Sequence, residues 1–356
     1  MNGSEYYRCP HCFTVVRPGE YHMQCSNRKC TGGREIDTEK CILLGIDPNG
    51  PNPITAQHHI VRNGNVCDVC GAVLKIRICP KCHHVIRTEL SADELNAVMF
   101  LAPHNCGLSH YMVSLVRVMH NVAKREFDGN LKPADSMVYD CMQKQYLSYI
   151  SRGMVIPSSK SPPEPIVYNL NCASKNLTLV FVDVACNKYG LPNLNRGSDI
   201  EGIMRESSGI VLLIDPETEE TTHASANILF HITELLHNSE DVDAAGKITI
   251  PLAVVLAKAD LLMTGDNPLL GPWSSVHMAR LPKELNDLSF TQVDMEVREI
   301  VKRISGEEIV ETAESYKENM FFAVSAIGYT PVEGSLTRGI EPFRVEDPLI
   351  WLLGRR

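Results

Sequence analysis

The feature that most constrains the fold of this chain is a series of four cysteine knuckles before residue 90. In each knuckle two or four residues separate a pair of cysteines, a gap that lets one turn direct two thiolates toward the same Zn²⁺ ion. Zn²⁺ prefers four such ligands at tetrahedral corners, so each knuckle supplies half a site. The knuckles predict two structural zinc sites, whose ligands are Cys9, Cys12, Cys25, Cys30, Cys67, Cys70, Cys79 and Cys82.

The spacing of the knuckles suggests how they pair. If consecutive knuckles form a site, 12 residues separate the knuckles of the first site and 8 those of the second, which suits a zinc ribbon. Proline inside CPHC and CPKC favours turns, and VLKIRI alternates as a β-strand does. Cysteines then fill all four positions of each site, so none is open for a catalytic water. Alternative ligands nearby are His11, His22, His83 and His84.

Residues 1–90 are therefore predicted to form a small double zinc-ribbon module. A module of this size buries too little apolar surface to be stable by burial alone, so metal binding should supply about 10 kcal/mol per site.

The chain has no recognisable N-terminal signal and no uninterrupted apolar run of membrane-spanning length, which predicts a cytoplasmic protein. In that compartment, cysteine pairs at knuckle spacing indicate metal ligands rather than disulfides.

The distribution of charge argues against nucleic acid as a partner. The formal charge is −9 overall, and residues 1–90 hold 11 Lys and Arg against 8 Asp and Glu. This slight positive balance falls far short of a basic nucleic-acid footprint, and the remainder of the chain is acidic. Nucleic-acid binding through the zinc ribbons is therefore the least favoured function.

Residues 91–356 have a different pattern, in which apolar runs alternate with segments of helical period. The runs have the length and continuity of strands buried on both faces, and the segments between them are amphipathic. The apolar runs cover 94–102, 166–170, 177–185, 209–215, 250–260 and 319–326, and the helical segments 110–127, 225–238 and 292–304. This alternation predicts an α/β domain with a doubly wound, mainly parallel sheet, whose ligands bind beyond the carboxyl ends of the strands.

The first apolar run ends in FLAPHNCGLSHYM, residues 100–112, where a nucleotide-binding protein carries its phosphate loop. That loop has the pattern G-x-x-x-x-G-K-S/T, in which backbone N–H groups and the lysine meet phosphate and the hydroxyl holds Mg²⁺. Here Gly107 and Ser109 are kept, but Ala102 replaces the first glycine and Leu108 replaces the lysine. Alone, this segment predicts only a tight turn from strand to helix.

Three other strand ends carry residues that match a GTPase in the expected order. Asp183 stands in the place of the D-x-x-G motif, although Cys186 replaces its glycine. The sequence AKAD stands for the N-K-x-D motif, and SA for the short element that follows the last strand. These two elements supply Lys258, Asp260, Ser325 and Ala326. Four elements in the right order are far more specific than any one of them.

Residues 91–356 thus resemble the GTPase domain of the TRAFAC clade. The whole chain is similar to bacterial zinc-ribbon GTPase-like proteins related to the double-GTPase family of prokaryotic conflict systems. The resemblance implies a site for GTP or GDP with Mg²⁺. By this resemblance, the residues of this chain that would face phosphate and Mg²⁺ are Gly107, Ser109 and Asp183. The residues that would hold guanine are Lys258, Asp260, Ser325 and Ala326.

The departures from the family pattern favour a pseudo-GTPase. Leu108 removes the main fixed positive charge that would face the phosphates, whereas the residues for base recognition are better kept. We expect weak or no binding of guanine nucleotide and a scaffold or regulatory role with protein partners from the same conflict or defence-like system. The alternative is an active GTP-hydrolysing switch, completed by a partner or by a positive charge from His104, Lys188, Arg196 or Arg205.

Overall fold

The computed structural model describes residues 7–17, 19–33, 35–43, 47–86, 95–134, 136–157, 165–172, 176–185, 204–237, 241–264, 268–272, 274–278 and 290–355. Two compact units divide the chain. One contains residues 1–95 and 193–206, and the other contains residues 96–192 and 207–356. The domains expected from the sequence, 1–90 and 91–356, stay a prediction.

The first unit is rich in cysteine and poor in regular structure. It contains a two-stranded antiparallel hairpin, a three-stranded antiparallel sheet in the order β4-β3-β5, and one short helix. These elements are β1 (Tyr7–Arg8), β2 (Val15–Val16), β3 (His22–Gln24), α1 (Thr38–Leu43), β4 (Ile60–Val61) and β5 (Ile76–Ile78). One cluster of buried residues in this unit contains only Cys25, Val61, Cys67 and Leu74. Strands this short, and a cluster half made of cysteines, agree with a fold that depends on more than apolar burial.

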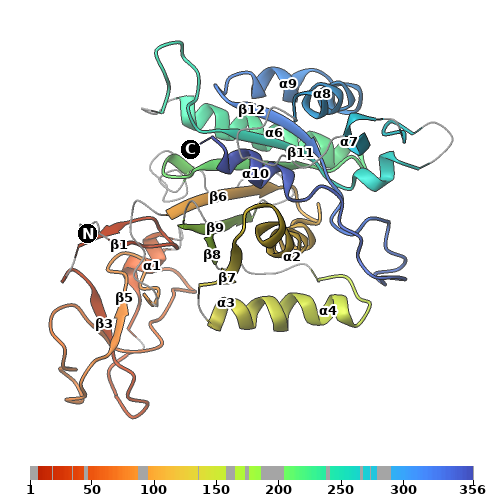
Figure 1. The fold of residues 1–356 in the computed structure, drawn as a ribbon. Coiled ribbons are helices and arrows are strands. Elements are labelled where there is room, and N and C mark those ends of the chain that lie inside the picture. The colour runs from red at the N-terminus through yellow and green to blue at the C-terminus, as the bar shows by residue number, and fades with distance from the viewer. Residues whose placement is uncertain are drawn as a thin grey trace. The chain divides into compact units, whose positions relative to one another are not determined.

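The second unit is built on a seven-stranded sheet in the order β12-β11-β10-β6-β9-β8-β7, coloured from orange through green to blue in Figure 1. Its strands are β6 (Leu95–Ala102), β7 (Asn130–Pro133), β8 (Ile166–Asn171), β9 (Asn176–Ala185), β10 (Gly209–Ile214), β11 (Leu252–Leu256) and β12 (Asn319–Ala323). β6, β10, β11 and β12 are parallel, whereas β7, β8 and β9 pair antiparallel. The predicted α/β class with a mainly parallel sheet is confirmed.

Helices cover both faces of this sheet. α6 (Glu219–His237), α8 (Thr291–Ser305) and α9 (Glu308–Ala313) pack against one another on one face, and α2 (Leu108–Glu126) lies on the opposite face (Figure 1). The shorter helices are α3 (Ser136–Cys141), the π-helical segment Met142–Leu147, α4 (Ser148–Ser151), the 3₁₀ turn Ala259–Leu262, α7 (Ser275–Met278) and α10 (Asp347–Leu353). No helix among the described residues is both long and apolar enough to cross a membrane.

The main core lies between α2, α10 and the sheet. The ring of Phe100 in β6 is fully buried and lies 5.9 Å from the ring of Tyr111 in α2 and 5.6 Å from that of Phe181 in β9. α10 approaches the start of β10 so closely that a Cβ at Gly209 would lie 2.5 Å from a methyl carbon of Leu352. A larger residue at this position would therefore force the side chain of Leu352 to shift within the packed core.

Candidate functional site

The eight knuckle cysteines form two groups of four, but their pairing differs from the sequence prediction. The first knuckle meets the fourth and the second meets the third, so the expected pairing of consecutive knuckles is wrong. The two groups are Cys9, Cys12, Cys79 and Cys82, and Cys25, Cys30, Cys67 and Cys70. Both groups could hold a structural zinc ion. None of the four histidines considered as alternatives is a member of either group.

The antiparallel sheet separates the second knuckle from the fourth. β3 pairs with β5 so that His22 lies opposite Ile78 and Gln24 opposite Ile76. The knuckle that follows β3 and the knuckle that follows β5 therefore begin at opposite ends of the strand pair. Cys25, directly after β3, instead donates its backbone N–H to the carbonyl of His59 at 2.9 Å, beside β4, the strand that leads to the third knuckle. Sequence spacing alone could not reveal this register.

Three of the knuckles share one backbone turn. The residue after the second cysteine has a positive φ: 58° at Phe13, 70° at Gly71 and 56° at His83. Its N–H donates to the carbonyl of the first cysteine of the same knuckle, at 2.8, 2.8 and 3.0 Å respectively. This turn directs the two thiol groups of a knuckle to the same side, as a shared ligand would require.

The sulfur separations fit Zn²⁺. Four sulfurs at about 2.3 Å from a tetrahedral Zn²⁺ lie about 3.8 Å apart. The Sγ–Sγ distances are 3.6 Å for Cys9–Cys82 and for Cys12–Cys79. They are 3.7 Å for Cys25–Cys70 and 3.8 Å for Cys30–Cys67.

Hydrogen bonds from the backbone N–H of Ala72 and the amide of Asn27 lower the pKa of Cys70 to about 6. That thiol is thereby biased toward the thiolate that a metal binds.

A cavity of about 270 Å³ in the α/β unit opens beyond the carboxyl ends of the parallel strands. β8 and β9 lie on one side of β6, and β10 to β12 on the other, so the strand order reverses at β6, where an α/β sheet binds ligands. The loop 103–107 joins β6 to α2, and Asn105, Cys106 and Gly107 from this loop line the cavity. Segments after β10, β11 and β12 form the other walls.

Four of the residues expected to contact guanine line this cavity: Lys258, Asp260, Ser325 and Ala326. The hydroxyl of Ser325 donates to Asp260 Oδ1 at 2.5 Å and accepts from the N–H of Gly328 at 2.8 Å. This arrangement holds the carboxylate of Asp260 at the edge of the cavity, and its second oxygen has no hydrogen-bond partner among the residues that the structure describes. The residues that the sequence singled out after β11 and β12 thus lie together in one cavity.

Lys258 is held by two carboxylates that the sequence reasoning did not connect with it. Its Nζ lies 2.8 Å from Asp215 Oδ2 and 2.5 Å from Glu217 Oε2. Burial alone would lower the pKa of Lys258, but the hydrogen bonds and charges of these carboxylates raise it. Asp215 also accepts from the N–H of Glu217 at 3.0 Å and so stabilises the turn after β10. The sequence offered one sign of this contact: both acidic residues directly follow β10, at the edge of the sheet where the residues after β11 also lie.

The residues expected to face phosphate are less well gathered. Gly107 precedes α2 with φ of 89° and lines the cavity, whereas Ser109 is not among the lining residues. Leu108 begins α2 and packs against the apolar core. Asp183 lies near the end of β9, outside the cavity lining, and burial raises its pKa to about 6. Nothing in the described lining replaces the lysine that Leu108 displaces.

Two of the positive charges considered as replacements, His104 and Arg205, are described by the structure, and neither lines the cavity. His104 is exposed, and Arg205 is not among the lining residues. Cys186, Lys188 and Arg196 lie outside the described residues. His110 does line the cavity, but burial lowers its pKa to about 4 and its Nε2 accepts from the backbone N–H of Ile156 at 2.9 Å, so the ring is neutral at pH 7.

Comparison with known proteins finds a similarity that extends over nearly the full length of the chain. No family model matches the chain. The chain is 21% identical, over an alignment of 399 positions including gaps, to the "Putative ESX-1 scaffolding and assembly protein SaeC" of Mycolicibacterium smegmatis. The alignment covers 97% of this chain and 98% of that relative, so the likeness includes both the cysteine-rich unit and the α/β unit.

Proposed function

We propose that this chain is a zinc-stabilised scaffold protein whose α/β unit is a pseudo-GTPase with weak or no binding of guanine nucleotide. The similarity to a scaffolding and assembly protein over 97% of the chain supports the scaffold role. By this proposal, the protein holds protein partners together while a larger complex assembles. Zn²⁺ in the two four-cysteine groups keeps the first unit folded and does no chemistry, because cysteines fill every position.

The charge of the cavity carries the pseudo-GTPase proposal. Its described lining holds two carboxylates, Glu217 and Asp260, against one ammonium group, Lys258. That ammonium group is already bonded to Asp215 and Glu217. A nucleoside triphosphate with Mg²⁺ needs fixed positive charge near its phosphates, and Leu108 supplies none. The cavity therefore disfavours the phosphates even though its base side is preformed.

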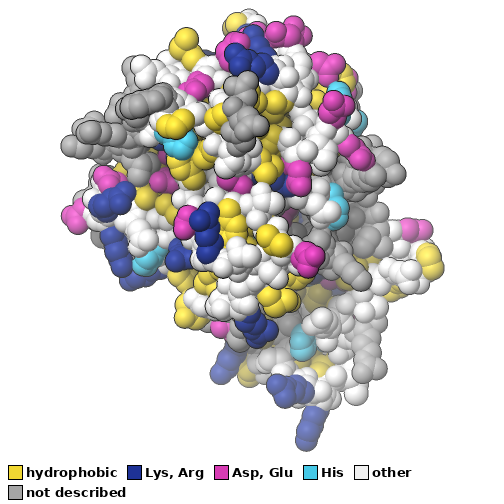
Figure 2. Space-filling model, turned by 90° about the vertical axis from the view of Figure 1, so that its right-hand side faces the viewer, with side chains coloured by type: hydrophobic (Ala, Val, Ile, Leu, Met, Phe, Trp, Pro, Cys, Tyr) yellow, Lys and Arg dark blue, Asp and Glu magenta, His cyan; other side chains and the backbone are white. Residues whose placement is uncertain are grey.

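Asp183 does not decide between a pseudo-GTPase and an active GTPase. Burial raises its pKa to about 6, but a carboxyl group with that pKa is still mostly ionised at pH 7 and could orient Mg²⁺. Nucleic acid has less support: on the face shown in Figure 2, Lys and Arg side chains are scattered among Asp and Glu rather than gathered in one basic patch.

The test of the nucleotide proposal is calorimetric titration of the zinc-loaded full chain with GDP and with a non-hydrolysable GTP analogue, with and without Mg²⁺. We expect no binding tighter than roughly millimolar for the natural protein. Leu108→Lys should strengthen binding of the analogue at least about tenfold, since one charge-assisted hydrogen bond contributes about 1.5–3 kcal/mol. Leu108→Met is the matched control, because it keeps an apolar side chain of similar volume without adding charge.

The competing hypothesis is that the chain is an active GTP-hydrolysing switch. Multiple-turnover GTP hydrolysis that Asp183→Ala abolishes would overturn the pseudo-GTPase proposal. For the scaffold role, partners captured by the tagged full chain should be the same with and without added guanine nucleotide. A set of partners that changes with GDP or the GTP analogue would indicate a nucleotide switch instead.

A further inference from the structure

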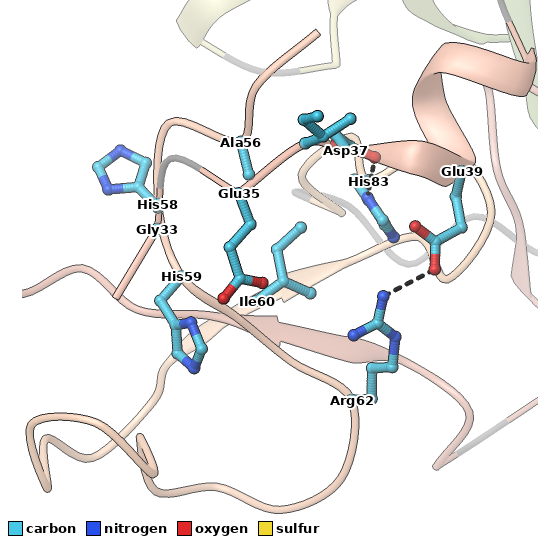
Figure 3. A pocket seen from close by; sticks show the side chains of 11 residues that line it. Gly33, Glu35, Asp37, Glu39, Ala56, His58, His59, Ile60, Arg62 and His83 are labelled. Atoms are coloured by element: carbon cyan, nitrogen blue, oxygen red, sulfur yellow. Dashed lines mark hydrogen bonds and ion pairs between the residues drawn. The ribbon is translucent and has the colours of Figure 1, made fainter. Parts of the chain in front are cut away.

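A small cavity in the cysteine-rich unit lies at the start of α1 and is drawn in Figure 3. Its volume of about 30 Å³ suits one ion or one water, not an organic ligand. Three carboxylates and one guanidinium group line it, a formal charge of −2 that a divalent cation would neutralise. These residues are Glu35, Asp37, Glu39 and Arg62. The cavity therefore combines the size and the charge of a cation site.

His83 supplies a nitrogen ligand that nothing in the described structure uses. Its side chain is 4% exposed, and its Nδ1 lies 2.9 Å from Asp37 Oδ1, on a carboxylate that is equally buried. A carboxylate only accepts, so it fixes the ring proton on Nδ1 and leaves the lone pair on Nε2. Nε2 is buried and has no hydrogen-bond partner among the described residues. An unpaired buried acceptor of this kind is costly unless a ligand occupies it.

Glu39 faces that nitrogen. Its Oε1 accepts from Arg62 Nη2 at 2.7 Å, and Figure 3 shows the carboxylate beside the free edge of the His83 ring. A carboxylate oxygen of Asp37, one of Glu39 and a ring nitrogen of His83 all lie within 4.8 Å of one another. Ligand atoms this close to one another can share one ion. Small side-chain rotations would bring each of them to the 2.0–2.2 Å from Zn²⁺ that its nitrogen and oxygen ligands adopt.

We propose that His83 Nε2 and the Glu39 carboxylate bind a third divalent cation of the zinc type, separate from the two four-cysteine groups. Asp37 is a positioning residue: it orients the His83 ring through Nδ1, as a carboxylate does in carboxylate–histidine–zinc sites. The same Asp37 oxygen accepts from the N–H of Lys40 at 3.0 Å and so caps α1. Imidazole nitrogen with carboxylate oxygen favours Zn²⁺ and similar ions over Mg²⁺ or Ca²⁺, and water completes the coordination.

The test starts from the full chain with both four-cysteine groups loaded with Zn²⁺, which accounts for two tightly bound equivalents. Titration with further Zn²⁺, followed by calorimetry and by metal analysis after dialysis, should reveal a third and weaker equivalent. Co²⁺ added to the same zinc-loaded protein should show the visible bands of a nitrogen and oxygen site without thiolate charge-transfer absorption.

Three variants should act on the third equivalent alone. His83→Asn keeps a residue type that tolerates the positive φ of 56° at this position and should abolish the third equivalent. Glu39→Gln should weaken it at least tenfold. Asp37→Asn retains a good helix cap and should weaken the affinity about 10- to 100-fold. His58→Asn is the matched control, because that ring points away from the other side chains in Figure 3 and should leave the affinity unchanged.

Each outcome decides the proposal. Only two equivalents in the natural protein, or a third equivalent that survives both His83→Asn and Glu39→Gln, would overturn it. Thiolate absorption on adding Co²⁺ would also overturn it, because the cation would then sit on a cysteine. If His83→Asn loses the two cysteine-bound ions, Glu39→Gln on α1 becomes the deciding variant. Nucleotide titrations are separate measurements, so this site can fail without affecting the proposed function.

Discussion

The two units of this protein obtain their stability from different sources. In the α/β unit every residue of β6, β10 and β11 is buried, and large apolar side chains from α2 and α10 fill the core against the sheet. In the cysteine-rich unit the strands are two or three residues long, and sulfur atoms form much of the interior. The cysteines that form this interior are thus also the candidate metal ligands of the first unit, whereas the core of the second unit is apolar.

The largest expected effect is chelation of the metal. Removing Zn²⁺ should cost the cysteine-rich unit on the order of 10 kcal/mol per site and unfold it, because little apolar burial remains to stabilise it. The α/β sheet should stay folded. Hydrogen exchange measured by mass spectrometry should show lost protection in β3 and β5 and retained protection in β6 and β11. Simultaneous loss in both units would contradict the comparison.

The reverse experiment removes a large side chain from the sheet core. Phe100→Ala should destabilise the α/β unit by about 3–5 kcal/mol, since the buried ring contacts both α2 and β9. Zinc content should not change. Phe230→Ala is the control, because that ring is 56% exposed and its loss should cost under about 0.5 kcal/mol. Denaturant unfolding followed by tryptophan fluorescence reports this unit, because both tryptophans lie within 207–356.

A smaller effect should come from the buried carboxyl group of Asp183. Burial raises its pKa from 3.8 to about 6, so the folded state binds more protons than the unfolded state between these pH values. The free energy of unfolding should therefore fall as pH rises from about 4 to 6, by up to about 3 kcal/mol. Asp183→Asn should remove this dependence. An equally steep pH profile in the variant would show that another group is responsible.

The smallest expected effect is at Glu217. Its side chain is 55% exposed, and Glu217→Gln should change stability by less than about 1 kcal/mol because exposed ion pairs contribute little. Asp215→Asn should cost more, since that carboxylate is only 2% exposed. Chemical denaturation of the two variants side by side gives this comparison. An equal cost for both would mean that the Lys258 ion pairs do not depend on burial.

The strands that sequence reasoning found and those it missed differ in composition. All six apolar runs contain a strand, because a strand buried on both faces needs an unbroken apolar segment. β7 escaped notice because its sequence, NLKP, is polar and ends in Pro133, which suits an edge strand. α10 is short, with Pro348 in its first turn, and only its packing on β10 and β11 shows why Trp351 and Leu352 are buried.

The sequence by itself determined the local features: the four knuckles, the buried strands and Leu108 at the position where the phosphate-loop pattern has a lysine. These follow from the spacing and type of neighbouring residues, which act over a few positions. Only the tertiary structure decided which knuckles form a four-cysteine group, that Asp215 and Glu217 hold Lys258, and that Asp37, Glu39 and His83 meet. Such contacts depend on strand register and helix packing, which bring together residues up to 73 positions apart in the chain. Patterns of neighbouring residues do not predict contacts between residues so far apart in the chain.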